Sequence, residues 1–178
     1  TLRWMRTASK AALSKCDAHT LKSLLSRCEP IGIPEEELLD YLFWLGQAST
    51  ATTNVPTLSM ASERLANMAP KGSKYWFYGL SGLVMVSGLL GDLDLLTRTL
   101  QRIGDPRDLD LSDLSSDQVS CFLAIISSLI DGRGWRVATP YIEAVEIAEL
   151  HLDPYDLLGR GWVYACRAVW ASHGGEGD

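Results

Sequence analysis

An uncharged run of seventeen residues, from Tyr75 to Gly91, constrains the fold of this chain more than any other feature. The run reads YWFYGLSGLVMVSGLLG and lies between Lys74 and Asp92. A helix that spans a membrane needs about 20 apolar residues, so this run is at the lower edge of that class. A helix at the centre of a protein that folds in water is also apolar on every side. Because nothing else in the sequence resembles a membrane protein, we expect residues 74–90 to form a buried central helix, with a lined pocket or an oligomer face as the alternative.

Four glycines interrupt the run and predict where neighbouring helices pack against it. Small residues allow two helices to approach closely, in water as in a membrane. Gly79 and Gly82 lie three residues apart, near the middle of the expected helix. We therefore expect a leucine at either position to unfold the protein, because the added side chain would overpack the contact.

Apolar residues recur at helical spacing, every three or four positions, along most of the remaining chain. Proline, glycine and capping residues fall between these stretches. No stretch alternates apolar and polar residues over the length of a strand. The apolar positions of the expected helices are Leu21, Leu24, Leu25 and Cys28; Leu38, Leu42 and Leu45; Leu58, Ala61, Leu65 and Met68; Leu93, Leu96, Leu100 and Ile103; Val119, Phe122, Ile126 and Leu129; Tyr141, Ile142, Val145 and Ala148; and Leu158, Trp162, Ala165 and Val169.

Short patterns predict where the helices begin. Pro34 suits a first helical position, and the three glutamates after it suit the positive end of a helix dipole. A loop is expected over ASTATTNVP, residues 48–56, because small polar residues are frequent there. The expected N-terminal caps of the later helices are Asp92, Ser115 with Gln118, Thr139 before Pro140, and Asp153 before Pro154.

These patterns predict an all-α fold in a single domain over residues 1–178. We expect eight or nine helices, arranged as an antiparallel stack of helical hairpins or as an orthogonal bundle around the central helix. A basic N-terminal helix is expected over residues 1–28 and a flexible glycine-rich tail over residues 174–178. The chain has 178 residues, of which 47% are hydrophobic, so it can build a core without a metal or disulfides.

Charge separates the start of the chain from the rest. The net charge of −6 argues against a dedicated nucleic-acid-binding protein. Residues 1–27 nevertheless carry six basic side chains against the single Asp17, a net charge of +5 that leaves −11 on the remaining residues. A basic amphipathic helix can contact an acidic partner, anionic lipid or phosphate. The candidate contact residues are Arg3, Arg6 and Lys10, and nucleic-acid binding through them is the alternative function.

No complete catalytic or metal-binding pattern occurs in the sequence. The three histidines lack the spacing of a metal site borne on one helix. The sequence Gly-Leu-Ser-Gly, residues 79–82, lacks the second spacer residue of a hydrolase nucleophile motif. We accordingly expect no enzyme, no cofactor and no metal. A small-ligand enzyme or binder with a pocket in the helical core is the third hypothesis, and it would require a deep cavity lined by Tyr75, Tyr78 and Met85.

The cysteines and the start of the chain predict where the protein resides. Four cysteines lie far apart without a Cys-x-x-Cys pair, so we expect reduced thiols. No signal peptide is visible after Thr1. We therefore expect a fragment of a larger protein in the cytoplasm or nucleus, without membrane insertion.

The sequence GRGWRVATP, residues 132–140, predicts a segment that binds a partner. Trp135 has Arg133 and Arg136 close to it, in what we expect to be a connector before a helix. An aromatic residue with neighbouring arginines is typical of an interaction hot spot, although a tryptophan can also fill the junction between helices. The sequence thus predicts a non-enzymatic helical interaction or scaffold domain that binds another protein or a second copy of itself.

Overall fold

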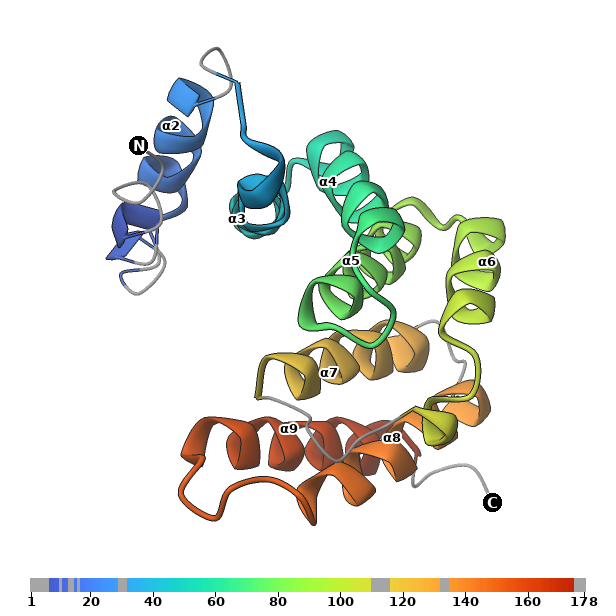
Figure 1. Cartoon of the computed structure of the whole chain (residues 1–178). Coiled ribbons are helices and arrows are strands. Elements are labelled where there is room, and N and C mark those ends of the chain that lie inside the picture. The colour runs from blue at the N-terminus through green and yellow to red at the C-terminus, as the bar shows by residue number, and fades with distance from the viewer. Residues whose placement is uncertain are drawn as a thin grey trace. The chain divides into compact units, whose positions relative to one another are not determined.

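The computed structural model describes residues 7–9, 11–12, 15, 17–28, 32–109, 116–131 and 135–174. Every regular element within these ranges is a helix, which confirms the predicted all-α fold. The elements are α2 (Ala18–Cys28), η2 (Glu35–Glu37), α3 (Leu38–Ala51), α4 (Val55–Met68), α5 (Lys74–Leu90), α6 (Leu93–Ile103), η3 (Pro106–Asp108), α7 (Ser116–Asp131), α8 (Trp135–Glu149) and α9 (Leu157–Gly174), where η marks a single 3-10 turn (Figure 1).

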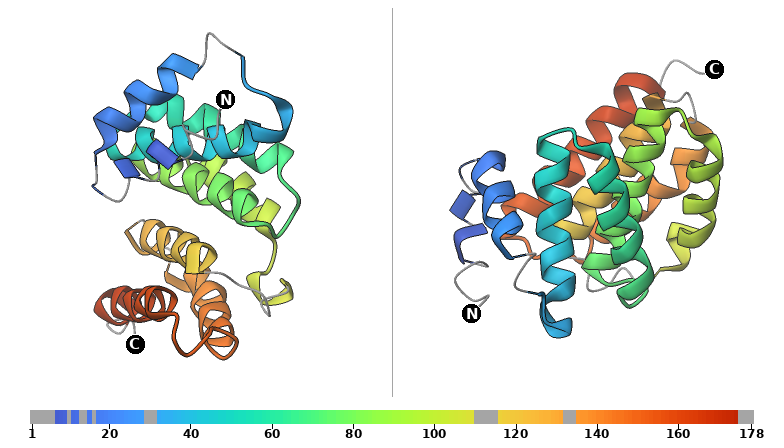
Figure 2. Two further views of the ribbon diagram at one scale, coloured as in Figure 1. Left: turned by 60° about the vertical axis from the view of Figure 1, so that its left-hand side comes forward. Right: turned by 90° about the horizontal axis from the view of Figure 1, so that it is seen from above.

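The chain divides into two compact units, residues 1–82 and 83–178, and the division falls inside α5. In the first unit, α3 packs on α2 and on α4, its antiparallel neighbour. In the second unit, α7 packs on α8 and α9, and α8 also contacts α9 and η3 (Figure 2). Short links between consecutive helices thus produce antiparallel packing, as predicted. A single domain over residues 1–178 stays a prediction.

The core of the first unit is built from one side of each of its helices. Leu21 and Leu25 of α2 are buried in one cluster with residues of α3 and with Ala61 and Leu65 of α4. Residues that recur every three or four positions share a helix face, which is why these positions meet. The predicted apolar stripe of α4 differs from the core only at its end, where Met68 is exposed.

The uncharged run forms α5, a helix of 17 residues, as predicted. Its side chains are mostly buried from Trp76 to Val86, whereas Leu89 and Leu90 of the last turn are exposed. The helix ends where Gly91 adopts a positive φ of 67°. The N–H of Asp92 then donates to the carbonyl of Ser87 at 2.9 Å, a bond that closes the C-terminal end of the helix.

Two glycines of α5 bring it against α4 within the first unit. A β-carbon added to Gly79 would lie 2.5 Å from the backbone nitrogen of Ala66 and 2.8 Å from the carbonyl oxygen of Ser62. A β-carbon added to Gly82 would collide with the hydroxyl of Ser62. Because real β-carbons do not approach other atoms this closely, the helices can meet here only while both residues remain glycine.

In the second unit, α7 and α8 supply most of the buried side chains, and α9 packs against α7. Phe122 and Ile126 of α7 are fully buried, as are Val163 and Cys166 of α9. The sequence predicted the buried stripe of α9 one residue too early, beginning at Leu158, which is exposed. This shift of the buried stripe follows from the cap of α9, which is Asp156 and not the predicted Asp153.

Of the four predicted helix starts on described residues, one is correct and three are wrong. Pro34, predicted as a first helical residue, is the cap that precedes the turn Glu35–Glu37. Asp92 caps α6, because its carboxylate accepts the N–H of Leu95 at 2.9 Å. The cap of α9 is Asp156, not Asp153, since Asp156 accepts the N–H of Gly159 at 2.9 Å. α8 begins four residues before the predicted Thr139, so that Pro140 lies inside it. A proline costs a helix one backbone hydrogen bond, and here the burial of the side chains of α8 offsets that loss.

Three further predictions concern loops and ends. The loop predicted over residues 48–56 is wrong, because α3 continues to Ala51 and α4 begins at Val55. A continuous helix over residues 1–28 is also wrong, since Asp17 accepts the N–H of Thr20 at 2.9 Å and so caps a new helix, α2. The predicted cap Ser115 and the tail beyond Gly174 lie outside the described residues.

Candidate protein-interaction surface

The structure changes the interpretation of the residues predicted to bind a partner. Arg3, Arg6, Lys10 and Arg133 lie outside the described residues. Trp135 and Arg136 are the first two residues of α8, so the predicted connector is wrong at these positions. Arg136 is exposed and takes part in at least one interaction within the protein. The expected cluster is therefore not established as one site.

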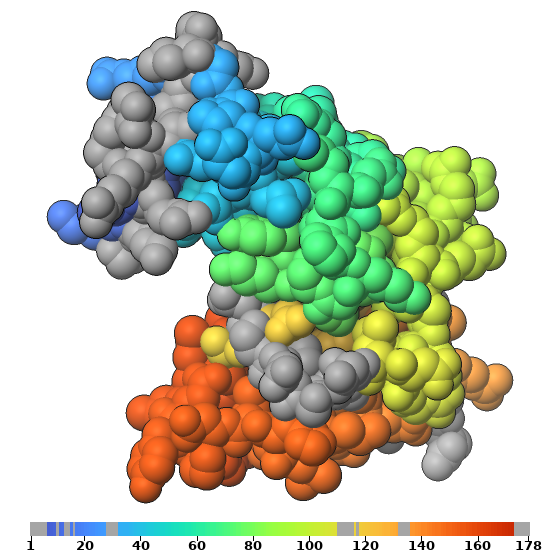
Figure 3. Space-filling view, viewed as in Figure 1, coloured from blue at the N-terminus to red at the C-terminus, as the bar shows by residue number. Residues whose placement is uncertain are grey.

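A different surface stands out in the second unit, at the turn between α8 and α9. The exposed fractions of its large apolar residues are 81% for Leu150, 90% for Tyr155, 82% for Leu157 and 59% for Leu158. We call these four residues the apolar turn surface. The turn is drawn in orange and reaches the surface of its unit at the lower left of the view (Figures 1 and 3). Single exposed apolar side chains are common, whereas four in one short segment make this turn a candidate contact surface.

Backbone hydrogen bonds hold this turn in a defined conformation. The N–H of Leu152 donates to the carbonyl of Ala148 at 3.1 Å, and the side chain of Leu152 is buried. Asp153 accepts the N–H of Tyr155 at 2.8 Å, after which Asp156 caps α9. Gly159 leaves room for that cap, because a β-carbon there would lie 2.6 Å from the Asp156 carboxylate. The exposed side chains are thus presented on an ordered backbone.

The charges around the turn are acidic. Between positions 149 and 158 the chain has Glu149, Asp153 and Asp156 and no lysine or arginine. Glu149 is paired with Arg167, whose guanidinium lies 2.6 Å from its carboxylate. Asp153 and Asp156 each accept one backbone N–H through a single carboxylate oxygen. A partner of this surface therefore meets apolar side chains with negative charge beside them.

Sequence reasoning missed this surface because it assigned Leu158 to the buried face of α9. A readable signal did exist in DPYDLL, residues 153–158. Two leucines that directly follow a capping aspartate occupy the first two positions of a helix, which point in different directions. Leu157 and Leu158 therefore cannot both be buried in the core of the second unit.

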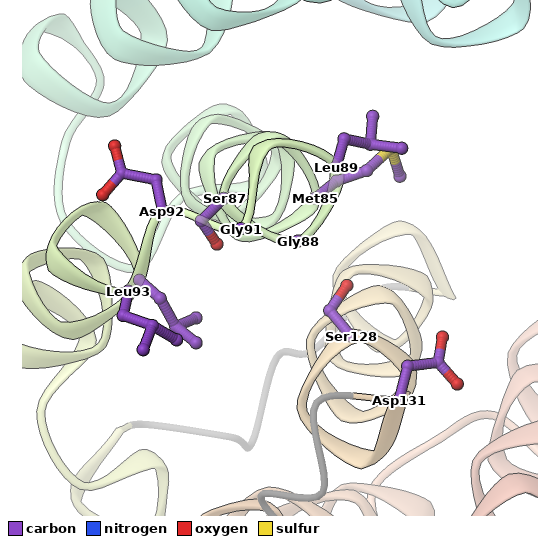
Figure 4. A pocket seen from close by; sticks show the side chains of 10 residues that line it. Met85, Ser87, Gly88, Leu89, Gly91, Asp92, Leu93, Ser128 and Asp131 are labelled. Atoms are coloured by element: carbon purple, nitrogen blue, oxygen red, sulfur yellow. The ribbon is translucent and has the colours of Figure 1, made fainter.

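A pocket of about 430 Å³ lies elsewhere in the second unit (Figure 4). The end of α5, the start of α6 and the end of α7 form its walls, and its lining residues are Met85, Ser87, Gly88, Leu89, Gly91, Asp92, Leu93, Leu96, Ser128 and Asp131. Tyr75 and Tyr78 do not line it; the rings of both contact Phe43 edge to face. Because Tyr75 and Tyr78 do not line this pocket, it is not the deep cavity that the hypothesis of a small-ligand enzyme or binder requires.

Two buried titratable groups of the second unit have pKa values raised by their surroundings. Burial raises the pKa of Cys166 to about 12, so its thiol is protonated at neutral pH and a poor nucleophile. Burial likewise raises the pKa of Tyr141 above its usual value, with Asp105 contributing. In the described ranges, no group of three or more His, Cys, Asp or Glu side chains is placed to hold a metal ion.

Two further observations bear on the class of protein. Among the described helices, none combines the length and apolar character needed to cross a membrane. No protein-family model matches the sequence, and no curated protein or solved structure is significantly similar to it. Any functional assignment must therefore come from the surfaces themselves.

Proposed function

We propose that this protein is a non-enzymatic helical interaction domain that binds another protein through the apolar turn surface. The observation that carries the proposal is the exposure of Leu150, Tyr155, Leu157 and Leu158 on one ordered turn. Leaving such side chains in water forgoes burial worth roughly 1.5–3 kcal/mol for each one that could be buried completely. A partner that covers them would recover part of that free energy.

The ordered backbone strengthens the proposal. Association costs free energy whenever a flexible segment must become fixed. Here Asp153, Asp156 and the buried Leu152 already fix the turn, so a smaller cost of this kind remains. Tyr155 supplies a large ring with a hydroxyl group, and tyrosine is enriched at the centres of interfaces. The turn therefore has the composition and the rigidity of a contact surface.

Site-specific photo-cross-linking tests the proposal. The photoreactive residue p-benzoylphenylalanine would replace Tyr155 in one variant and Met68 in another, because Met68 is an exposed apolar residue of the first unit. After irradiation in an extract of cells that make the protein, we expect one discrete cross-linked product from position 155 and none from position 68. Equal products from both positions, or none from either, would refute the proposal.

A variant with altered charge then tests which side chains matter. We expect Leu157→Asp to abolish the product formed from position 155, because the new carboxylate would have to be desolvated in the interface. Leu157 is exposed, so the far-ultraviolet circular dichroism spectrum should not change. Persistence of the product in the folded variant would show that the contact lies elsewhere. The nucleic-acid alternative depends on Arg3, Arg6 and Lys10 and stays a prediction.

A further inference from the structure

We propose that the pocket at the end of α5 binds a basic amphipathic helix of a partner protein. An apolar side chain of that helix would enter the pocket, and lysines or arginines on either side of it would approach Asp92 and Asp131. We call this site the α5–α7 pocket. It is distinct from the apolar turn surface, and the inference does not rest on the function proposed above.

The walls and rim of the α5–α7 pocket are suited to an apolar side chain. Met85, Leu89, Leu93 and Leu96 supply most of its lining. Leu93 is 73% exposed, and Leu89 is exposed as well. The volume of about 430 Å³ lies within the range of sites that hold part of a ligand. These leucines are the exposed end of the otherwise buried α5 and the start of the helix that follows it.

Glycine keeps the pocket open. Gly88 lines the pocket, and a β-carbon built on it would have no atom within 4 Å. In Figure 4, Gly88 lies on the side of α5 that faces Ser128 of α7. No neighbouring helix occupies this space, in contrast to the space beside Gly79. Because Gly88 lines the pocket, a larger side chain at this position would extend into the space beside α5.

The charges at the pocket favour a cation. Asp92 and Asp131 are the charged lining residues, and they lie at opposite sides of the pocket in Figure 4. Asp131 is the last residue of α7, where the helix dipole is negative and a basic residue would be favoured. The last turn of α5 also lacks a basic residue. The C-terminal ends of α5 and α7 thus lie at an apolar opening together with two carboxylates. One oxygen of Asp92 caps the positive N-terminal end of α6, so Asp131 supplies the less compensated negative charge.

This arrangement distinguishes between occupants. Carboxylates at opposite sides suit a segment with positive charges on both sides of an apolar residue, which an amphipathic helix provides. A second copy that inserts its apolar turn surface is disfavoured, because Asp153 and Asp156 would accompany it and repel the two pocket carboxylates. The basic helix is therefore the occupant that the charges select.

The test uses a fluorescein-labelled 14-residue peptide with leucine and tryptophan on one helical face and lysine and arginine on the other. Binding to the full chain is measured by fluorescence anisotropy. One control peptide has the same composition in scrambled order, and another has glutamate in place of every lysine and arginine. We expect binding of the first peptide only. Equal binding of the scrambled peptide would show general charge attraction and overturn the proposal.

Three variants separate binding at the pocket from folding. Asp131→Lys should weaken binding about threefold to tenfold, while the dipole of α7 makes lysine favourable for folding. Asp92→Asn removes charge but keeps a capping side chain, and should also weaken binding.

Gly88→Phe should fill the opening and weaken binding more than tenfold. Asp108→Lys makes the same charge change at an exposed residue outside the pocket and should leave affinity unchanged.

Other outcomes would identify other occupants or none. If Asp131→Lys and Asp108→Lys weaken binding equally, the peptide senses net charge and the pocket is not its site. If Gly88→Phe leaves the affinity unchanged while the variant remains folded, the peptide does not enter the pocket. If the wild-type chain self-associates and Gly88→Phe abolishes this without any peptide, a second copy is the occupant. Each of these results would overturn the proposal.

Discussion

The first half and the last turn of α5 use glycine in opposite ways. Beside Gly79 and Gly82 the neighbouring helix α4 already occupies the space of a side chain. Beside Gly88 there is no atom within 4 Å of the position that a β-carbon would take. One uncharged helix therefore combines a part that is committed to the core with a part that forms a surface. The absence of charge predicts the helix but does not distinguish these two parts.

The largest effect is expected at Gly79. Gly79→Ala should lower the free energy of unfolding by about 3 kcal/mol, the upper part of the range for overpacking, because the methyl group meets the backbone of α4. Gly79→Leu should prevent folding. Urea denaturation followed by circular dichroism measures the first effect. A loss below roughly 0.5 kcal/mol would show that the two helices are not in contact at this point.

A smaller loss of stability is expected at Gly82, and a second substitution should restore much of it. Its added methyl group meets the side-chain hydroxyl of Ser62, not the backbone, so Gly82→Ala should cost about 1–2 kcal/mol. Ser62→Ala removes that hydroxyl and should restore much of the loss in the double variant. The same change should not rescue Gly79→Ala. Equal rescue at both positions would contradict the geometry described for the contact.

The end of α5 should respond with the opposite sign. Gly88→Ala adds a better helix former without a clash and should raise the free energy of unfolding by about 0.5–1 kcal/mol. The measurement is the same urea titration. Destabilisation by this alanine would mean that another part of the chain packs against Gly88, and the contrast within α5 would no longer hold.

The smallest effect concerns the second unit, in which ion pairs stabilise exposed positions. Hydrogen bonds from Arg107 lower the pKa of Asp105 to about 2, from an ordinary value of 3.8. A carboxyl group with a lowered pKa stabilises the fold above pH 4 and loses that effect between pH 4 and pH 2. Asp105→Asn should therefore lower the melting temperature slightly at pH 7, and the difference should shrink as the pH falls from 4 to 2 and below. An equal difference at pH 7 and at pH 2 would exclude this cause.

The sequence predicted features that depend on a single short stretch of residues. The uncharged run, the spacing of Leu21 and Leu25, and the cap Asp92 required no knowledge of neighbours. The start of α9 did require it, because Asp153 and Asp156 are equally good caps and the choice between them sets which leucines are exposed. In the structure Leu152, just before these caps, is buried, and the local pattern of the sequence did not indicate that burial.

The connector predicted around Trp135 is wrong for a related reason, whereas partner binding by this segment stays a prediction. Thr139 before Pro140 is a strong start signal, yet α8 begins earlier. The pattern gave no indication that Ala138 would be fully buried as part of the helix. Trp135 and Arg136 consequently became helical residues. The α5–α7 pocket could not be predicted either, since its residues come from three helices whose packing no single stretch of sequence describes.

Both described free cysteines, Cys121 and Cys166, are buried in the second unit, on α7 and α9. With a pKa of about 12, only roughly one Cys166 thiol in ten thousand is ionised at pH 8 while the unit stays folded. A thiol reagent will consequently react mainly during rare openings of these helices. In a chain with Cys16→Ser and Cys28→Ser, the rate of labelling would act as a clock for those openings. It would measure how often this half of the intact protein unfolds without reporting on the other half.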